Sequence, residues 1–189
     1  MNKLLHVALL LFSSTALANP CTVAPIDPNA PERAFDFLLG QHRVTLHAWW
    51  NDAWSPPRPA AAEWNGWVGL AGQAIYDEWH DPDPDQGGSG VNVRIYDAET
   101  SEWKMMWIST KGKVVQELHA GIVDGVLRMW QIHPKRPGWH AEFHVLDENR
   151  WARTEHMEIN GQSEPKFRLV ATRTGCAEET RIPSDTTEG

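Results

Sequence analysis

Hydrophobic and polar residues alternate along most of the chain after Gly40. Short turn signals such as Lys111-Gly112, Asp124-Gly125 and Asn160-Gly161 separate the alternating stretches. A period of two residues is typical of β-strands with one buried face, and such turn pairs are typical of β-hairpins. The pattern predicts about ten strands, over 42–50, 60–68, 73–80, 90–97, 102–110, 113–121, 125–132, 139–146, 150–158 and 165–173.

A short helix is predicted before the first strand, over 31–39. Pro31 stands at a first-turn position, and Gly40 follows the segment as a stop signal. The strands must bury one face and protect their edges, and closure into a barrel does both. We therefore predict an all-β fold: an up-and-down antiparallel β-barrel of about ten strands with a short N-terminal helix. A β-sandwich is the competing architecture.

The beginning of the chain has a different pattern. Lys3 precedes an apolar run over 4–12, and Ala16-Leu17-Ala18 follows. This is the charge, apolar segment and cleavage site of a secretory signal peptide. We expect cleavage after Ala18 and a periplasmic or secreted protein. The predicted organisation is a signal peptide over 1–18, one barrel domain over 19–176 and a polar C-terminal tail over 177–189.

Composition and charge limit the classes of partner that the protein can bind. The 189 residues carry a formal net charge of −8 and include 11 Trp, against 2 Tyr and 5 Phe. An acidic chain lacks the basic face that nucleic-acid binding uses, and no segment has the apolar length of a membrane span. We expect neither nucleic-acid binding nor membrane insertion, and no oligomeric state is predicted. Cys21 and Cys176 lie near the two ends of the predicted domain, and an oxidising compartment favours a disulfide between them.

Several segments resemble a known family. Residues 35–44 read FDFLLGQHRV, which is similar to the F-x-F-L-x-G-x-W opening of lipocalin-like bacterial proteins of the DUF1579 type, in the calycin superfamily. Residues 93–103 resemble the mid-chain hairpin of that family, and Thr172-Arg173 its closing strand. His42 stands where the family has a Trp at the base of the barrel. The resemblance implies a calycin-like barrel with a ligand-sized cavity, and it implies no reaction.

The short turns also predict which side chains face the lumen. They pair Tyr96 with Trp103, Ser109 with Val114 and Leu118 with Gln131. The face that contains these residues has Arg94 as its single formal charge, whereas the opposite face carries several. Unpaired charges are costly to bury, so the first face is the predicted lumen. The predicted ligand-binding residues are Arg94, Tyr96, Trp103, Met105, Trp107, Gln116 and Gln131.

Arg94 among aromatic side chains suggests an anchor. A guanidinium can hold a carboxylate while aromatic walls bury an apolar body. The leading hypothesis is an exported barrel that binds a small hydrophobic or aromatic molecule, which can be anionic, and no cofactor is predicted. The alternative for Arg94 is a structural pairing with a buried Asp or Glu.

A histidine-rich stretch offers a second chemistry. His140, Glu142 and His144 alternate along one predicted strand and therefore share a face. A turn near residue 148 would place His144 opposite Arg153 and Glu142 opposite Glu155. If the protein is an enzyme, His144 or His140 would act as the base and Glu142 would orient it. The reaction would be that of a cofactor-free lyase, isomerase or hydrolase acting on a small aromatic compound.

The same histidines allow two further interpretations. Two imidazoles and a carboxylate can bind a metal, and a barrel histidine can ligate haem. Ala141, Phe143 and Val145, however, alternate with the polar residues and look like the core face. In that case the histidines and Glu142 form a solvated ladder of charges on the outside. The sequence leaves these alternatives open.

Overall fold

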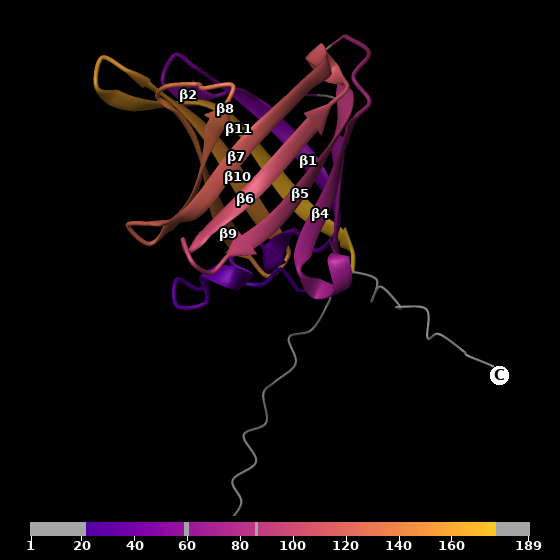
Figure 1. Ribbon diagram of the computed structural model, residues 1–189. Helices are drawn as coiled ribbons and strands as arrows, with labels where there is room; N and C mark the ends of the chain where they lie inside the picture. Colours follow the sequence, from indigo (N-terminus) through magenta and orange to yellow (C-terminus); the bar gives the residue numbers. More distant parts are fainter. Residues whose placement is uncertain (1–21, 59–60, 86, 177–189) are drawn as a thin grey trace, which may run out of the picture.

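Antiparallel strands that follow one another in chain order form a closed ring (Figure 1). This computed structural model describes residues 22–176, apart from 59–60 and 86. One sheet of eleven strands is closed by pairing between its first and last long strands, so it is an up-and-down antiparallel barrel and not a sandwich. The strands are β1 (Gly40–Trp50), β2 (Ala53–Trp54), β3 (Ala62–Gly69), β4 (Ala74–Asp81), β5 (Gly88–Asp97), β6 (Glu102–Ser109), β7 (Val114–Val123), β8 (Val126–His133), β9 (Trp139–Asp147), β10 (Arg150–Ile159) and β11 (Gln162–Gly175).

Each predicted strand overlaps one of the long strands. The sequence did not predict β2, a strand of 2 residues that folds back on the end of β1. Asn51 and Asp52 connect the two strands with φ of 49° and 58°. Positive φ at both central residues is typical of a tight hairpin turn, and Asn and Asp tolerate it better than most side chains.

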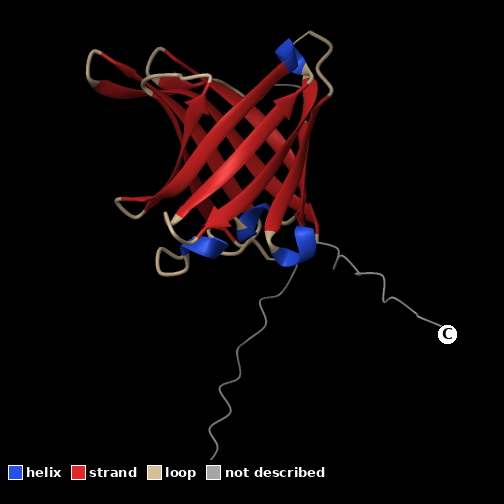
Figure 2. Cartoon of the chain, viewed as in Figure 1, coloured by secondary structure: helices blue, strands red, loops and turns tan. Residues whose placement is uncertain are grey.

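The predicted N-terminal helix over 31–39 is wrong in type. The segment forms two separate 3₁₀ turns, η1 (Pro31–Arg33) and η2 (Asp36–Leu38), at the lower end of the barrel (Figure 2). Phe35 lies between them with φ of −103° and ψ of 8°, so the helix is interrupted. Phe35 and Phe37 are both buried in the barrel, and this packing outweighs the weak helical preference of so short a segment.

These turns close the lower end. The Phe35 ring packs edge-on against Trp103, with 5.3 Å between ring centroids, and against Phe143, with 5.4 Å. The Trp103 indole N–H donates a hydrogen bond to the Pro31 carbonyl at 2.8 Å. Phe35 and Phe37 therefore belong to the main hydrophobic core.

The predicted hairpin registers are confirmed from β5 to β8. The observed pairs include Tyr96 with Trp103, Ser109 with Val114 and Leu118 with Gln131. The predicted lumen face is correct as well: Arg94, Trp103, Met105, Leu118 and Met129 are all buried.

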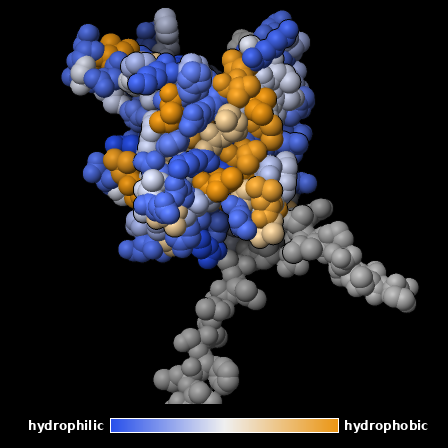
Figure 3. All heavy atoms as spheres, in the orientation of Figure 1, coloured by the Kyte–Doolittle hydropathy of each residue, from blue (hydrophilic) through white to orange (hydrophobic). Residues whose placement is uncertain are grey.

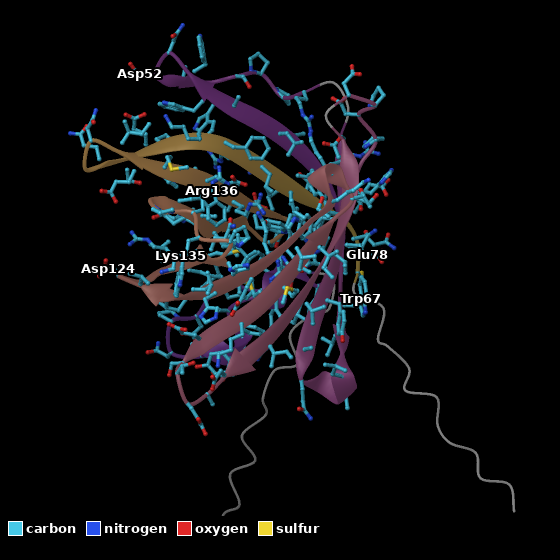
Figure 4. All side chains as sticks on the ribbon, turned by 45° about the horizontal axis from the view of Figure 1, so that its top comes forward. Asp52, Trp67, Glu78, Asp124, Lys135 and Arg136 are labelled. Carbon is cyan, nitrogen blue, oxygen red and sulfur yellow. The ribbon has the colours of Figure 1, made fainter. Side chains whose placement is uncertain are left out.

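The outer face of the same strands is partly hydrophobic. Apolar side chains extend across the face of β5 to β7 that Figure 3 presents, and they include Ile95, Met106, Ile108 and Val115. On the neighbouring strands, Trp67 and Glu78 project from the outside of the barrel (Figure 4). Trp67 stacks there on Tyr76, with 5.8 Å between ring centroids.

The predicted register of the β9–β10 hairpin is wrong by one residue. His144 pairs with Ala152, and Glu142 pairs with Thr154, because an irregularity shifts the register between Arg150 and Trp151. Extra residues of this kind change which side chains of a strand face inward. As a result Arg153 pairs with Phe143 and lies on the lumen side.

Some predictions fall on residues outside the described part of the chain. The signal peptide over 1–18, cleavage after Ala18 and the tail over 177–189 stay predictions, and so does the Cys21–Cys176 disulfide, because Cys21 is not described. Within 22–176, apart from the gaps given above, no helix is long and apolar enough to cross a membrane.

Candidate ligand-binding site

The predicted anchor Arg94 lies in the sealed lower half of the barrel. Arg94 and Asp77 are fully buried and form an ion pair. With its amide oriented to satisfy both neighbours, Asn92 accepts a hydrogen bond from Arg94 Nη2 at 2.9 Å. The guanidinium also lies over the Phe35 ring, 4.9 Å from its centroid. This is the structural pairing that the sequence left open as the alternative to ligand binding.

Burial, with a smaller contribution from the charge of Arg153, lowers the pKa of Arg94 to about 9. The guanidinium stays protonated at neutral pH, and Asp77 neutralises it. A charge that is already paired and hydrogen-bonded within the core has little capacity left for a ligand.

The upper half of the barrel contains a cavity of about 400 Å³. This volume lies within the range of small-molecule sites. Its apolar walls come from β1, β3, β4, β6 and β11, and charged and polar side chains complete the lining. The walls are Leu46, Ala48, Trp64, Trp79, Trp107, Phe167 and Leu169, and the polar lining is His47, Ser55, Arg58, Asp81, Lys111 and Arg153.

Packing fixes the aromatic walls. The Trp64 ring lies nearly perpendicular to Trp79 and to Trp151, with centroid distances of 5.6 Å and 5.2 Å. Trp107 lies against Gly90, where an added Cβ would be 2.3 Å from the indole ring. Glycine at that position therefore lets the ring approach the β5 backbone closely. These contacts hold the walls in place before any ligand arrives.

Two arginines contribute positive charge to this cavity. The Arg153 guanidinium lies over the Trp64 ring at 5.8 Å and donates to Glu155 at 2.6 Å. Arg58 forms ion pairs with Asp81 and, at 3.3 Å, with Asp83. Arg153 Nε, Arg58 Nε and the Trp64 indole N–H are buried and have no hydrogen-bond partner among the described residues. Buried donors of this kind normally bind water or another acceptor.

His42 lies on the inner face of β1. The ring is buried against Trp151, with 5.8 Å between centroids, and its Nδ1 lies 3.3 Å from the Trp64 carbonyl oxygen. Burial lowers the pKa of His42 to about 4, and the nearby charge of Arg173 adds to the effect. The imidazole is therefore neutral at neutral pH.

Of the predicted ligand-binding residues, Trp107 is a lining residue of this cavity. The others do not line it. Arg94, Trp103 and Met105 are packed in the core, and the Tyr96 ring packs on Trp103 with 5.6 Å between centroids. Gln116 donates a hydrogen bond to Gln131 at 3.4 Å. The sequence analysis did not single out Asp77 or Trp79. The alternation along β4 could have identified both, because they lie on its inner face. Arg58 follows two prolines in an irregular segment and gave no signal.

The candidate catalytic residues lie outside the barrel. His140, Glu142 and His144 share the outer face of β9, while Ala141 and Phe143 are buried on its inner face. The enzyme hypothesis needs the histidines in the lumen, and the structure does not bring them there. The outward orientation agrees with the alternative prediction for these three residues, but Arg153, which that prediction placed on the same outer face, lines the cavity instead.

Comparisons with known proteins add little to this geometry. No protein-family model and no curated protein matches the chain. Among solved structures, the chain is similar to the S-type phycobiliprotein lyase CPES from Guillardia theta. The TM-score is 0.46 and the identity 14%, over 83% of this chain and 100% of that chain. A similarity of this size does not bear on function.

Proposed function

We propose that the protein binds a small molecule with an aromatic or apolar body and an anionic group in the upper cavity. The observation that carries this proposal is the Arg153 guanidinium over Trp64, inside a cavity of about 400 Å³ with aromatic walls. The buried donors on Arg153 and Trp64 have no partner among the described residues. A carboxylate or sulfonate group could accept hydrogen bonds from both donors.

The rest of the cavity suits an apolar body. Trp79, Trp107 and Phe167 offer aromatic surface, and Leu46 and Leu169 offer aliphatic surface. Removal of such a body from water supplies most of the binding free energy, whereas the polar groups fix its orientation. Arg58, with its own acidic partners, adds a second cation to the lining.

The setting of this function is part of the proposal. The N-terminal pattern favours export with cleavage after Ala18, and the opening and hairpin motifs favour kinship with lipocalin-like proteins of the DUF1579 type. The intact mass of the exported protein tests both the cleavage and the Cys21–Cys176 disulfide. We expect the chain from Asn19 onward, less two hydrogens.

Two fluorescent probes of nearly the same shape test the ligand class. 1-Anilinonaphthalene-8-sulfonate carries a sulfonate, and N-phenyl-1-naphthylamine lacks it. We expect the full chain to bind the sulfonate more tightly, and Arg153→Gln to weaken the sulfonate about tenfold or more, the scale of a charged hydrogen bond. The neutral probe should change little.

Arg43→Gln is the matched control, because Arg43 is exposed on β1. Equal binding of both probes by the unmodified protein would contradict an anion site. An identical loss in Arg153→Gln and Arg43→Gln would show a general charge effect rather than a specific contact. Native mass spectrometry of gently purified protein would then show whether a natural ligand is carried.

A further inference from the structure

The outer wall of the barrel contains a cluster of imidazoles that the cavity does not use. His140 on β9 pairs directly with His156 on β10. The two rings are stacked nearly parallel, at 6° and with 4.9 Å between centroids. Two protonated imidazoles would repel each other at that distance. The stacked arrangement therefore favours neutral rings, which is the form that ligates metals.

Glu142 lies between these histidines. Its carboxylate oxygens are 3.8 Å from His140 Nε2 and 3.8 Å from His156 Nε2. The three groups can each offer a ligand atom, and these atoms lie within 4.8 Å of one another. All three side chains are roughly a fifth to a quarter exposed, so an ion could reach them from solvent.

We propose that His140, Glu142 and His156 form a binding site for a divalent transition-metal ion of the zinc class. Two imidazole nitrogens and one carboxylate oxygen are a ligand set that such ions prefer, with bonds of about 2.0–2.2 Å. Modest rotations of the three side chains toward a shared ion would bring the ligand atoms into that range. A fourth position is left for water.

Arg128 on β8 positions the carboxylate. Its Nε donates to Glu142 Oε1 at 2.9 Å. A hydrogen bond to one oxygen orients the group and leaves Oε2 toward His156, as outer partners of metal ligands commonly do. The charges of Arg128 and Glu142 also offset each other, so the ion meets a site that is close to neutral. His144 Nε2 lies 3.6 Å from Glu142 Oε2, so a third imidazole is close to the site.

The metal site is separate from the cavity, because its side chains lie on the outer face of β9 and β10, whereas the cavity lies inside the barrel. Metal binding and ligand binding can therefore each fail without the other.

Zinc titration of the full chain tests the site, after the protein has been treated with a chelator and freed of any histidine tag. Isothermal titration calorimetry with ZnCl₂ should show one saturable site. His156→Gln and His140→Gln should each weaken it tenfold or more. His156→Gln is the decisive variant, because it removes a ligand that only the β9–β10 pairing supplies.

His119→Gln is the matched control. His119 also lies on the outer face and contacts two glutamates, Glu102 at 3.0 Å and Glu117 at 3.6 Å. It should leave zinc affinity unchanged. Co²⁺ gives a second readout, since a four-coordinate nitrogen and oxygen site produces intense visible absorption that His156→Gln should abolish.

The proposal is overturned if the unmodified chain shows no saturable zinc binding. It is also overturned if His119→Gln weakens zinc as much as His156→Gln does. These side chains face outward, so the variants should keep the native near-ultraviolet circular dichroism, and a lost signal cannot then be ascribed to misfolding.

Discussion

The two halves of the barrel surround an inward-facing arginine in opposite ways. In the lower half, Arg94 has Asp77 and Asn92 as partners and Phe35 beneath it. In the upper half, Arg153 has one carboxylate partner, an aromatic face and an unused donor beside a cavity. The difference teaches that a charge inside a barrel indicates ligand binding only where it borders open space: Arg153 lines the cavity, whereas Arg94 is enclosed in the core beside its counter-charge Asp77.

Asp77→Ala should have the largest effect on stability. It leaves the Arg94 guanidinium buried without its counter-charge, and removal of one partner of a buried pair costs about 3–5 kcal/mol. Urea unfolding measures the change. The pair of Asp147 with Arg150 at the β9–β10 turn is the control, because both side chains are substantially exposed and Asp147→Ala should cost at most about 1 kcal/mol. Similar losses in the two variants would remove the contrast between inside and outside.

Titration of His42 should come next in size. Its pKa is about 4 in the folded protein and about 6.5 in the unfolded chain. Between these values the unfolded state binds more protons, so the free energy of unfolding falls as the pH falls from 6.5 toward 4. A shift of this size corresponds to about 3 kcal/mol.

His42→Phe removes this titration and fills a similar volume. We expect the variant to lose less stability than the unmodified protein over the same pH range, as measured by urea unfolding at several pH values. The difference between the two curves isolates His42 from the carboxyl groups that both proteins share. Parallel curves would show that His42 is not held neutral by burial.

Arg153→Gln should have the smallest effect on stability. The partly exposed ion pair with Glu155 and the contact with Trp64 together contribute about 1 kcal/mol. Thermal or urea unfolding should therefore change little while probe binding falls. A loss as large as that of Asp77→Ala would mean that Arg153 supports the fold in the same way as Arg94.

The sequence was most informative where turns are short. From β5 to β8 the hairpin turns determine the register, so the inward positions of Arg94, Met105 and Met129 were predicted correctly. The same reasoning failed at β10, because the irregularity near Trp151 has no signal in the alternation. That single shift concealed Arg153, and with it the site.

Other parts of the site depend on contacts between distant segments. Asp77 pairs with Arg94 only because β4 lies beside β5, and the loop over 82–87 is too long to set that register from sequence. The segment at Phe35 has weak helical signals, but its side chains are drawn into the barrel instead. Local patterns thus predicted which strands form, and tertiary packing decided which of their charges remain available.

The pairing of β1 with β11 has a consequence for how the barrel forms. Val44 pairs with Ala171 and Leu46 with Leu169, whereas the other long strands pair with neighbours close in sequence. Contacts so distant along the chain carry the largest loop-closure cost and tend to form late in folding. Leu46 and Leu169 also line the cavity. A bound molecule would therefore contact both β1 and β11 and stabilise their pairing, so that occupancy of the cavity should slow the opening of the barrel.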